Sequence, residues 1–221
     1  MIFLVAMIGS EKSHEVRDLA ASFHNQNIRV LEVKEEFSRG SALNRGAAEF
    51  QEHELILFMD VDMSYSEEFL NRCRNNAILG KRVFFPIPWS QYDPKVIKSG
   101  NPPGKPEVRH LDQISKWTGY WIHYGYGMVC LYKADFVPFE RIQGWGGEDV
   151  AFFKAMVARW KAENGEFQIL HSVEPDLVHR YHSRSCDKAG LSKDQYRMCI
   201  GAMADTLGNK QQLGVLYLDS Q

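Results

Sequence analysis

The first 87 residues alternate short apolar runs with amphipathic stretches, and this alternation limits the possible folds more than any other feature of the sequence. Apolar runs suited to β-strands lie at residues 2–7, 28–33, 55–59 and 83–87. Stretches with helical spacing of their apolar residues lie between them, at residues 15–24, 41–50 and 64–76. Strands that alternate with helices are typical of a mostly parallel sheet covered on both faces. The sequence therefore predicts an α/β fold, with residues 1–221 forming a single domain.

The second half of the chain is less regular. Residues 86–110 contain six of the eight prolines, which predicts a long surface loop. Further strands are expected at residues 167–170 and 177–181, and further helices at residues 148–161 and 194–206. We find no internal repeat and no composition shift that would mark a linker between domains.

The balance of charge excludes two classes of partner. The chain has 26 basic and 28 acidic side chains, so it predicts neither a nucleic-acid groove nor a polybasic membrane patch. No apolar run approaches the roughly 20 residues needed to cross a bilayer. We therefore expect no membrane contact by this chain itself. Its cysteines permit two bridges in three possible pairings, and the pairing stays open for Cys73, Cys130, Cys186 and Cys199.

Two carboxylates end the third predicted strand. In LILFMDVDMSY, Asp60 and Asp62 directly follow an apolar run, and ligands of α/β proteins bind beyond the carboxyl ends of strands. If the extended conformation continues, their spacing puts both side chains on the same side of the chain. Two negative charges that close favour a hard divalent cation between them. The alternative is a loop in which the two residues only cap the next helix.

Two histidines in the last quarter of the chain are candidate metal ligands. His179 and His182 lie in PDLVHRYHSRSC, and imidazole suits Mn²⁺ or Zn²⁺. On a straight strand their odd spacing would point them to opposite faces, so shared ligation requires a bend in the chain. Histidines at this spacing also occur without a metal, and the pair gains weight only where the fold brings it to Asp62.

The segment GWGGEDV places an aromatic ring just before two carboxylates. Trp145 offers a flat apolar face between glycines that permit close backbone approach. Glu148 and Asp149 follow in the first turn of a predicted helix, where the helix dipole alone favours acidic residues. A ring that holds a sugar, beside a carboxylate that accepts a hydroxyl proton, is also what inverting glycosyl transfer needs.

Arg39 stands beside Gly40, just before a predicted helix. A helix start with a cation next to it suits a diphosphate or nucleotide contact. An ordinary strand-to-helix turn explains the same residues.

Taken together, seven segments resemble the chondroitin N-acetylgalactosaminyltransferases and the carboxyl-terminal catalytic domain of chondroitin synthases. They are FSRGSALNRGA, LFMDVDMSYSEEFLNRCR, FPIPWSQYDPKVI, TGYWIHYGYGM, GWGGEDV, VHRYHSRSC and DQYRMCIGAMADT. The family is related to the β-1,4-galactosyltransferases, so the resemblance implies a GT-A glycosyltransferase fold with an Asp-x-Asp motif at a strand end. It also implies that the chain lacks the family's first strand and its amino-terminal membrane anchor.

The same resemblance implies a role for each candidate residue. The cofactor is Mn²⁺, and its implied ligands are Asp62, His179 and His182. The nucleotide of a UDP-sugar donor is implied to contact Phe37, Arg39 and Asp60. Implied contacts to the sugar and the acceptor are Tyr124, Trp145 and Glu148. The implied catalytic base is Asp149.

The implied reaction is an inverting transfer of N-acetylgalactosamine from UDP-GalNAc to the 4-hydroxyl of a terminal glucuronic acid, on a chondroitin or linkage-region oligosaccharide. The family implies the Golgi lumen as location and allows a hetero-oligomer with another chondroitin synthase subunit. A different class of function is also open, that of a catalytically silent GT-A partner of a chondroitin-polymerising subunit. A metal-dependent phosphodiesterase would use the same aspartates and histidines but would leave the GWGGED segment unexplained.

Overall fold

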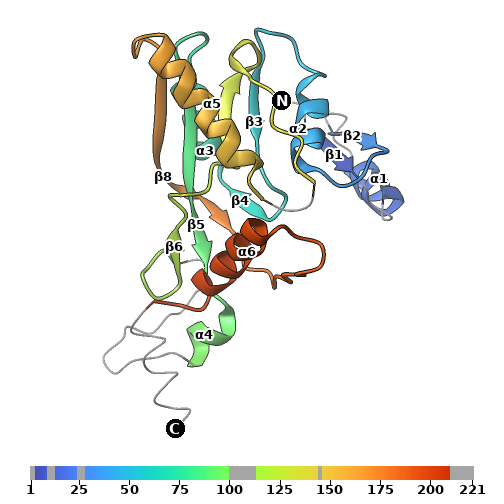
Figure 1. The fold of residues 1–221 in the computed structure, drawn as a ribbon, viewed down its shortest axis with the longest axis vertical. Coiled ribbons are helices and arrows are strands. Elements are labelled where there is room, and N and C mark those ends of the chain that lie inside the picture. Colours follow the sequence, from blue (N-terminus) through green and yellow to red (C-terminus); the bar gives the residue numbers. More distant parts are fainter. Residues whose placement is uncertain (1–2, 9–12, 24–27, 100–112, 144–145, 210–221) are drawn as a thin grey trace.

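The computed structural model describes residues 3–8, 13–23, 28–99, 113–143 and 146–209 (Figure 1). The strands are β1 (Phe3–Ile8), β2 (Ile28–Val33), β3 (Leu55–Phe58), β4 (Met63–Tyr65), β5 (Arg82–Gln91), β6 (Gly119–Trp121), β7 (Val129–Tyr132) and β8 (Gln168–His179). The helices are α1 (Ser13–Ser22), α2 (Arg39–Ala47), α3 (Glu67–Asn76), α4 (Pro94–Ser99), α5 (Glu148–Ala162) and α6 (Lys193–Asp205), with a 3₁₀ turn at Lys133–Asp135. Within these ranges no helix combines the length and the apolar character that a bilayer span requires.

The strands form two sheets, and the larger one is mixed. β1 and β2 pair in parallel as a two-stranded sheet, which lies with α1 and α2 to one side of the larger sheet (Figure 1). The larger sheet has the order β3-β7-β5-β8-β4, with β6 paired to the end of β5. Among its described strand pairs, β5–β8 is parallel and the others are antiparallel. The predicted α/β class is confirmed, whereas the prediction of a mostly parallel sheet is wrong.

The insertion of β7 explains the difference in strand direction. The run β3–α3–β5 predicts two parallel neighbours, and β3 and β5 do point the same way. However, β7 lies between them and is antiparallel to both. β7 comes from residues 129–132, in the second half of the chain. The alternation of strands and helices in the first half therefore does not predict its position.

The core lies on both faces of the mixed sheet, because successive strand residues point to opposite sides. On one face Phe85 of β5 packs in a cluster with Phe152 of α5. On the other face Phe84 packs in a cluster with Phe69 of α3. All four rings are at most 1% exposed. The sheet is therefore a middle layer between α5 and α3.

The loop predicted at residues 86–110 begins later than expected, because Pro86 and Pro88 belong to the buried strand β5. One edge of β5 pairs with β7 at Phe84 and with β6 from Trp89 onward. Between these two positions no described strand pairs with that edge, so prolines there interrupt no ladder on that side. The later part of the predicted loop lies outside the described residues.

The two short strands predicted at residues 167–170 and 177–181 are one strand, β8, with an irregularity inside it. Its register with β5 shifts between Val173 and Val178. The irregular stretch contains Glu174, whose side chain is 1% exposed and accepts hydrogen bonds from Arg72 of α3 at 2.6 and 2.8 Å. Asp176 also pairs with Arg72. One guanidinium on α3 therefore holds the bulge that precedes the end of β8.

We expect Arg72→Ala to lower the free energy of unfolding by about 3 kcal/mol, because it leaves the buried Glu174 carboxylate without a cation. The control is Arg45→Ala, which removes an exposed pair with Glu35 on the protein surface and should change that free energy by less than about 1 kcal/mol. Urea unfolding measures both values. Equal effects of the two variants would contradict the structural role of the Arg72 contact.

Candidate active site and metal centre

The short strand β4 places Asp62 against the end of β8. Met63 of β4 lies opposite His179, and the N–H of Arg180 donates to the Asp62 carbonyl at 2.9 Å. Oδ2 of Asp62 then lies 3.4 Å from Nε2 of His179 and 3.0 Å from Nε2 of His182. The chain leaves the strand after His179, which supplies the bend that shared contact with Asp62 requires.

These three side chains fit a divalent cation. One ligand atom from each lies within 4.8 Å of the others. Oδ1 of Asp62 is buried and has no hydrogen-bond partner among the described residues, so it is available to a ligand. Burial raises the pKa of Asp62, but the hydrogen bond from His179 and the charges of His179 and His182 outweigh it and hold that pKa below its usual value. A carboxylate with two imidazoles suits Mn²⁺ or Zn²⁺.

Asp60 contacts a different partner, Arg39 at the start of α2. The guanidinium donates to Oδ1 of Asp60 through Nε at 2.9 Å and through Nη2 at 2.7 Å. Nη2 also donates to the Gly127 carbonyl at 3.0 Å, and Nη1 donates to Oε1 of Glu148 at 3.2 Å. A Cβ atom on Gly127 would lie 3.0 Å from Nη2, so a larger residue there would crowd this contact. Arg39 thus joins three segments that are distant in the sequence.

The expectation that Asp60 and Asp62 share one side of an extended chain is wrong. The chain makes a turn between β3 and β4, and Val61 between the two aspartates is 96% exposed. The turn sends one carboxylate to a guanidinium and the other to the two imidazoles. The Asp-Val-Asp stretch therefore links two clusters rather than forming one.

Burial and charge act against each other at Arg39 and Glu148. Burial lowers the pKa of Arg39, but the carboxylates of Asp60, Glu148 and Asp149 outweigh it and raise that pKa above its usual value. Burial raises the pKa of Glu148, and Arg39 offsets only part of this effect. A backbone hydrogen bond and the Arg39 charge both lower the pKa of Glu148, whose side chain is 7% exposed, but burial outweighs them.

Asp149 lies in the first turn of α5, where two backbone N–H groups donate to its carboxylate. Oδ2 accepts from Tyr126 at 3.2 Å and Oδ1 accepts from Val150 at 2.8 Å. The helix starts after Gly147, whose φ of +102° lies in the left-handed region that favours glycine. Asp149 raises the pKa of Arg39 but forms no ion pair with any residue in the described ranges. Its oxygens thus keep a fixed direction without a cation bound to them.

The other predicted site residues have mixed outcomes. The hydroxyl of Tyr124 donates to Asp205 at the end of α6, and the side chain is 45% exposed. Phe37 is 52% exposed in the segment before α2. Trp145 lies outside the described residues. The structure therefore brings together the predicted metal ligands and the predicted charged residues, and it leaves the ring of Phe37 open to solvent.

Three residues that hold the site were not predicted from the sequence. Oγ of Ser90 lies 3.0 Å from Nδ1 of His179, and Asp205 accepts from Tyr124. Both belong to segments that carry the family resemblance, but no spacing rule links them to partners so far away in the chain. Gly127 contributes a backbone carbonyl, which leaves no side-chain signal at all.

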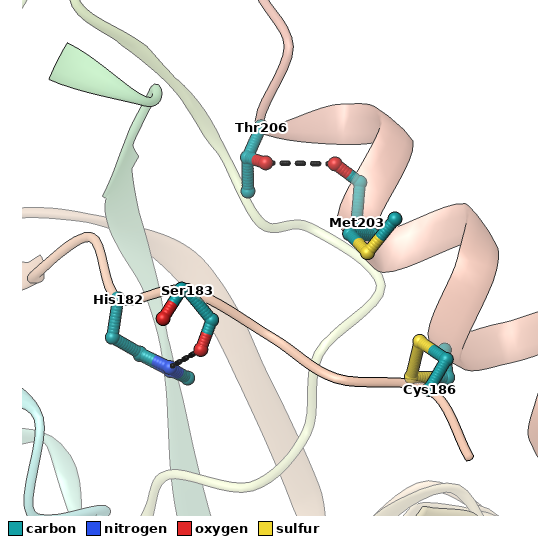
Figure 2. Close-up of a disulfide and its surroundings, with 6 residues drawn as sticks. His182, Ser183, Cys186, Met203 and Thr206 are labelled. Carbon is teal, nitrogen blue, oxygen red and sulfur yellow. Dashed lines mark hydrogen bonds between the residues drawn. A yellow bond between two sulfur atoms is a disulfide. The ribbon is translucent and has the colours of Figure 1, made fainter. Parts of the chain in front are cut away.

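Two disulfides select one of the three possible pairings. Cys73–Cys130 joins α3 to β7, and Cys186–Cys199 joins the segment after His182 to α6. Figure 2 shows the second bridge together with His182, which lies upstream on the same stretch of chain. The chain that follows the two candidate histidine ligands is therefore tied covalently to α6.

Comparison with known proteins identifies the relatives of this chain. A family model described as chondroitin N-acetylgalactosaminyltransferase matches residues 7–213. The chain is 37% identical over 227 residues to chondroitin sulfate synthase 3 of Homo sapiens, and this match covers 99% of this chain and 24% of that protein. It is 34% identical over 226 residues to chondroitin sulfate N-acetylgalactosaminyltransferase 2 of Homo sapiens, and this match covers 96% of this chain and 39% of that protein. The chain thus spans well under half the length of these relatives.

Among solved structures, glucosyl-3-phosphoglycerate synthase from Mycobacterium tuberculosis, in complex with Mn²⁺, UDP and phosphoglyceric acid, matches with a TM-score of 0.48 and 16% identity. The match covers 94% of this chain and 68% of the other, and at this score it does not establish a shared fold. The family model, in contrast, covers nearly all of the sequence. The chain belongs to the chondroitin N-acetylgalactosaminyltransferase family.

Proposed function

We propose that this chain is a cation-dependent glycosyltransferase domain of the GT-A type. It moves N-acetylgalactosamine from UDP-GalNAc to the 4-hydroxyl of a glucuronic acid that ends a chondroitin-type oligosaccharide. The observation that carries the proposal is the cluster of Asp62, His179 and His182, in which one buried carboxylate oxygen has no partner. Membership of the family supports the substrate class, because its relatives are named for chondroitin synthesis and N-acetylgalactosaminyl transfer.

The donor would lie between the two clusters. Asp62, His179 and His182 would hold Mn²⁺, which when bound neutralises the charge of the departing diphosphate. Arg39 and Asp60 lie one turn of chain away, where the nucleotide part of the donor would be recognised. The exposed ring of Phe37 precedes them and offers an apolar face to a base.

The contacts favour Asp149 over Glu148 as the catalytic base. Glu148 is buried, and the Arg39 guanidinium already pairs with one of its carboxylate oxygens, so a cation competes there with a proton. Within the described part of the chain, Asp149 accepts hydrogen bonds from backbone N–H groups alone, which orient its carboxylate without supplying a competing cation. In the proposed reaction Asp149 takes the proton from the acceptor hydroxyl. The freed oxygen attacks the anomeric carbon as the diphosphate leaves, which inverts the configuration at that carbon. Glu148, Trp145 and Tyr124 are the proposed contacts to the sugars.

The disulfides support the proposed location in the Golgi lumen. Disulfides form and persist in oxidising compartments and are rare in the cytosol. Cys73–Cys130 and Cys186–Cys199 account for all four cysteines of the chain. A protein that keeps both bridges is suited to a secretory compartment.

Calorimetric titration with UDP tests the proposed cation site. We expect UDP to bind at least about tenfold more tightly with Mn²⁺ than without it, because the cation offsets repulsion between the diphosphate and the nearby carboxylates. Asp62→Ala should remove this dependence on Mn²⁺. Asp18→Ala changes an exposed carboxylate on α1 and should keep it. UDP binding that responds neither to Mn²⁺ nor to the loss of Asp62 would overturn the cation site.

Replacement of the proposed base separates binding from chemistry. We expect Asp149→Asn to keep UDP affinity within about twofold and to lower the transfer rate by about 100-fold or more, because the amide cannot take the hydroxyl proton. Asp18→Asn is the matched control. The assay offers UDP-GalNAc and a chondroitin oligosaccharide that ends in glucuronic acid. Transfer by Asp149→Asn at the parental rate would show that the base is another residue. A native chain that binds UDP with Mn²⁺ but transfers nothing would favour the silent-partner function.

The dependence of Glu148 on Arg39 predicts a pH effect on stability. The pKa of Glu148 is raised in the folded state, so folding favours its neutral form and stability is lost as pH rises through that pKa. Arg39→Met removes the offsetting charge. We therefore expect this substitution to destabilise the protein by about 2 kcal/mol more at pH 8 than at pH 4. Urea unfolding at both pH values measures the difference, and Arg39→Met combined with Glu148→Gln should reduce it. A pH-independent effect of Arg39→Met would contradict this coupling.

A further inference from the structure

Residues 179–182, which we call the bend, carry the two candidate histidine ligands on different kinds of backbone. His179 is the last residue of β8 and is 8% exposed, so the sheet holds it. His182 lies three residues later in irregular chain, and its side chain is 47% exposed. Both must stay at Asp62 for one cation to be shared. Something other than the strand must therefore fix the chain between them.

The end of β5 makes three contacts to this bend. Oγ of Ser90 lies 3.0 Å from Nδ1 of His179. Oε1 of Gln91 accepts from the backbone N–H of Tyr181 at 3.2 Å. The hydroxyl of Tyr181 donates to Oδ2 of Asp93 at 2.8 Å. We call Ser90 and Gln91 of β5, together with Asp93 just after this strand, the β5 clamp.

Two of the three clamp residues are buried, and the third, Asp93, is anchored by its own hydrogen bonds. Ser90 is fully buried and Gln91 is 8% exposed, so water competes little for these hydrogen bonds. The N–H of Asp93 donates to the carbonyl of Thr206 at 2.9 Å, just after α6. Oδ1 of Asp93 accepts from the N–H of Lys95 in α4 at 2.8 Å. Asp93 therefore offers Oδ2 to Tyr181 from a fixed position.

The bend is also held from its downstream side by α6. The disulfide Cys186–Cys199 ties the chain after His182 to this helix (Figure 2). The carboxyl end of the same helix, at Thr206, meets Asp93 of the clamp. The disulfide and the clamp are thus both attached to α6 or its carboxyl end. Among the side-chain contacts of the clamp, the one to the Tyr181 hydroxyl is nearest to His182 along the chain.

We propose that the β5 clamp and Tyr181 are positioning residues for the cation site: Ser90 orients the His179 ring, and the Tyr181–Asp93 hydrogen bond holds His182 at Asp62. A hydrogen bond at Nδ1 leaves Nε2 of His179 directed at Asp62, which is the arrangement a ligating histidine requires. Residues that orient ligands in this way affect metal affinity without touching the metal. The inference rests on the proposed function in one respect, that the ligand of the cluster is a divalent cation.

Tyr181→Phe tests the inference, because it removes one hydroxyl and leaves the ring and the clamp in place. Asp93 is less suitable, since its other oxygen holds the start of α4. We expect Tyr181→Phe to bind Mn²⁺ about tenfold more weakly in the absence of any nucleotide, with a changed electron paramagnetic resonance spectrum of the bound ion. Tyr132→Phe, at the end of β7 that pairs with the start of β3, is the matched control and should bind Mn²⁺ as the native chain does. A purely structural role would lower the unfolding temperature and leave Mn²⁺ affinity unchanged, which would overturn the inference.

A second measurement needs no metal. We expect faster hydrogen exchange of the backbone amides of residues 180–184 in Tyr181→Phe than in the native chain or in Tyr132→Phe. Equal exchange would overturn the inference by itself. A native chain that shows no Asp62-dependent Mn²⁺ binding would instead overturn the cation site of the proposed function, and the exchange rates would still decide whether the clamp holds the bend. Native Mn²⁺ affinity in Tyr181→Phe would overturn the clamp and leave the proposed function standing.

Discussion

The antiparallel pairing of β4 with β8 is the interaction on which the rest of the site depends. It is a short ladder, from Met63–His179 to Tyr65–Leu177. Without it no strand pairing would bring Asp62 to the end of β8, which β5 holds on its other side through Ser90 and His179. Three residue pairs give little stability alone, so the ladder depends on α3, whose Phe69 lies in one core cluster with Met63 and Leu177. Packing of α3 against the sheet thus helps to hold Asp62 at the end of β8.

The sequence allowed the kinds of element to be predicted better than their partners. Alternating apolar patterns placed β3, α3 and α5 close to their observed bounds, because periodicity is a local property. Strand direction is not local, and the insertion of β7 between β3 and β5 could not be inferred from either neighbour. The prolines of β5 were misleading for a related reason. They are tolerated only because one edge of that strand has a gap in its pairing, and such a gap exists only once the sheet is assembled.

In the candidate site, too, residue types could be predicted from the sequence better than the contacts between them. The residue types of the cation cluster were indicated by the apolar run before Asp62 and by the resemblance that included the two histidines. The bend after His179 was required by their spacing and is present. The pairing of Asp60 with Arg39 was not predicted, because an extended chain was assumed where the structure has a turn. The clamp contacts could not have been predicted at all, since Ser90 and Tyr181 are ordinary residues until β5 and β8 lie side by side.

The charges at this edge of the sheet give the proposed cation a specific role. Asp60, Glu148 and Asp149 surround Arg39, and Asp62 lies one turn of chain away. Most N–H donors of Arg39 are already taken by Asp60, Glu148 and a backbone carbonyl, so this guanidinium cannot neutralise a further anion on its own. A nucleotide diphosphate that approaches these carboxylates meets like charge. A divalent ion at Asp62 would be the largest local charge and would reverse the sign of that interaction. Under the proposed function, the excess of carboxylates would make the recognition of an anionic donor conditional on the cation, which a site built around arginine alone would not do.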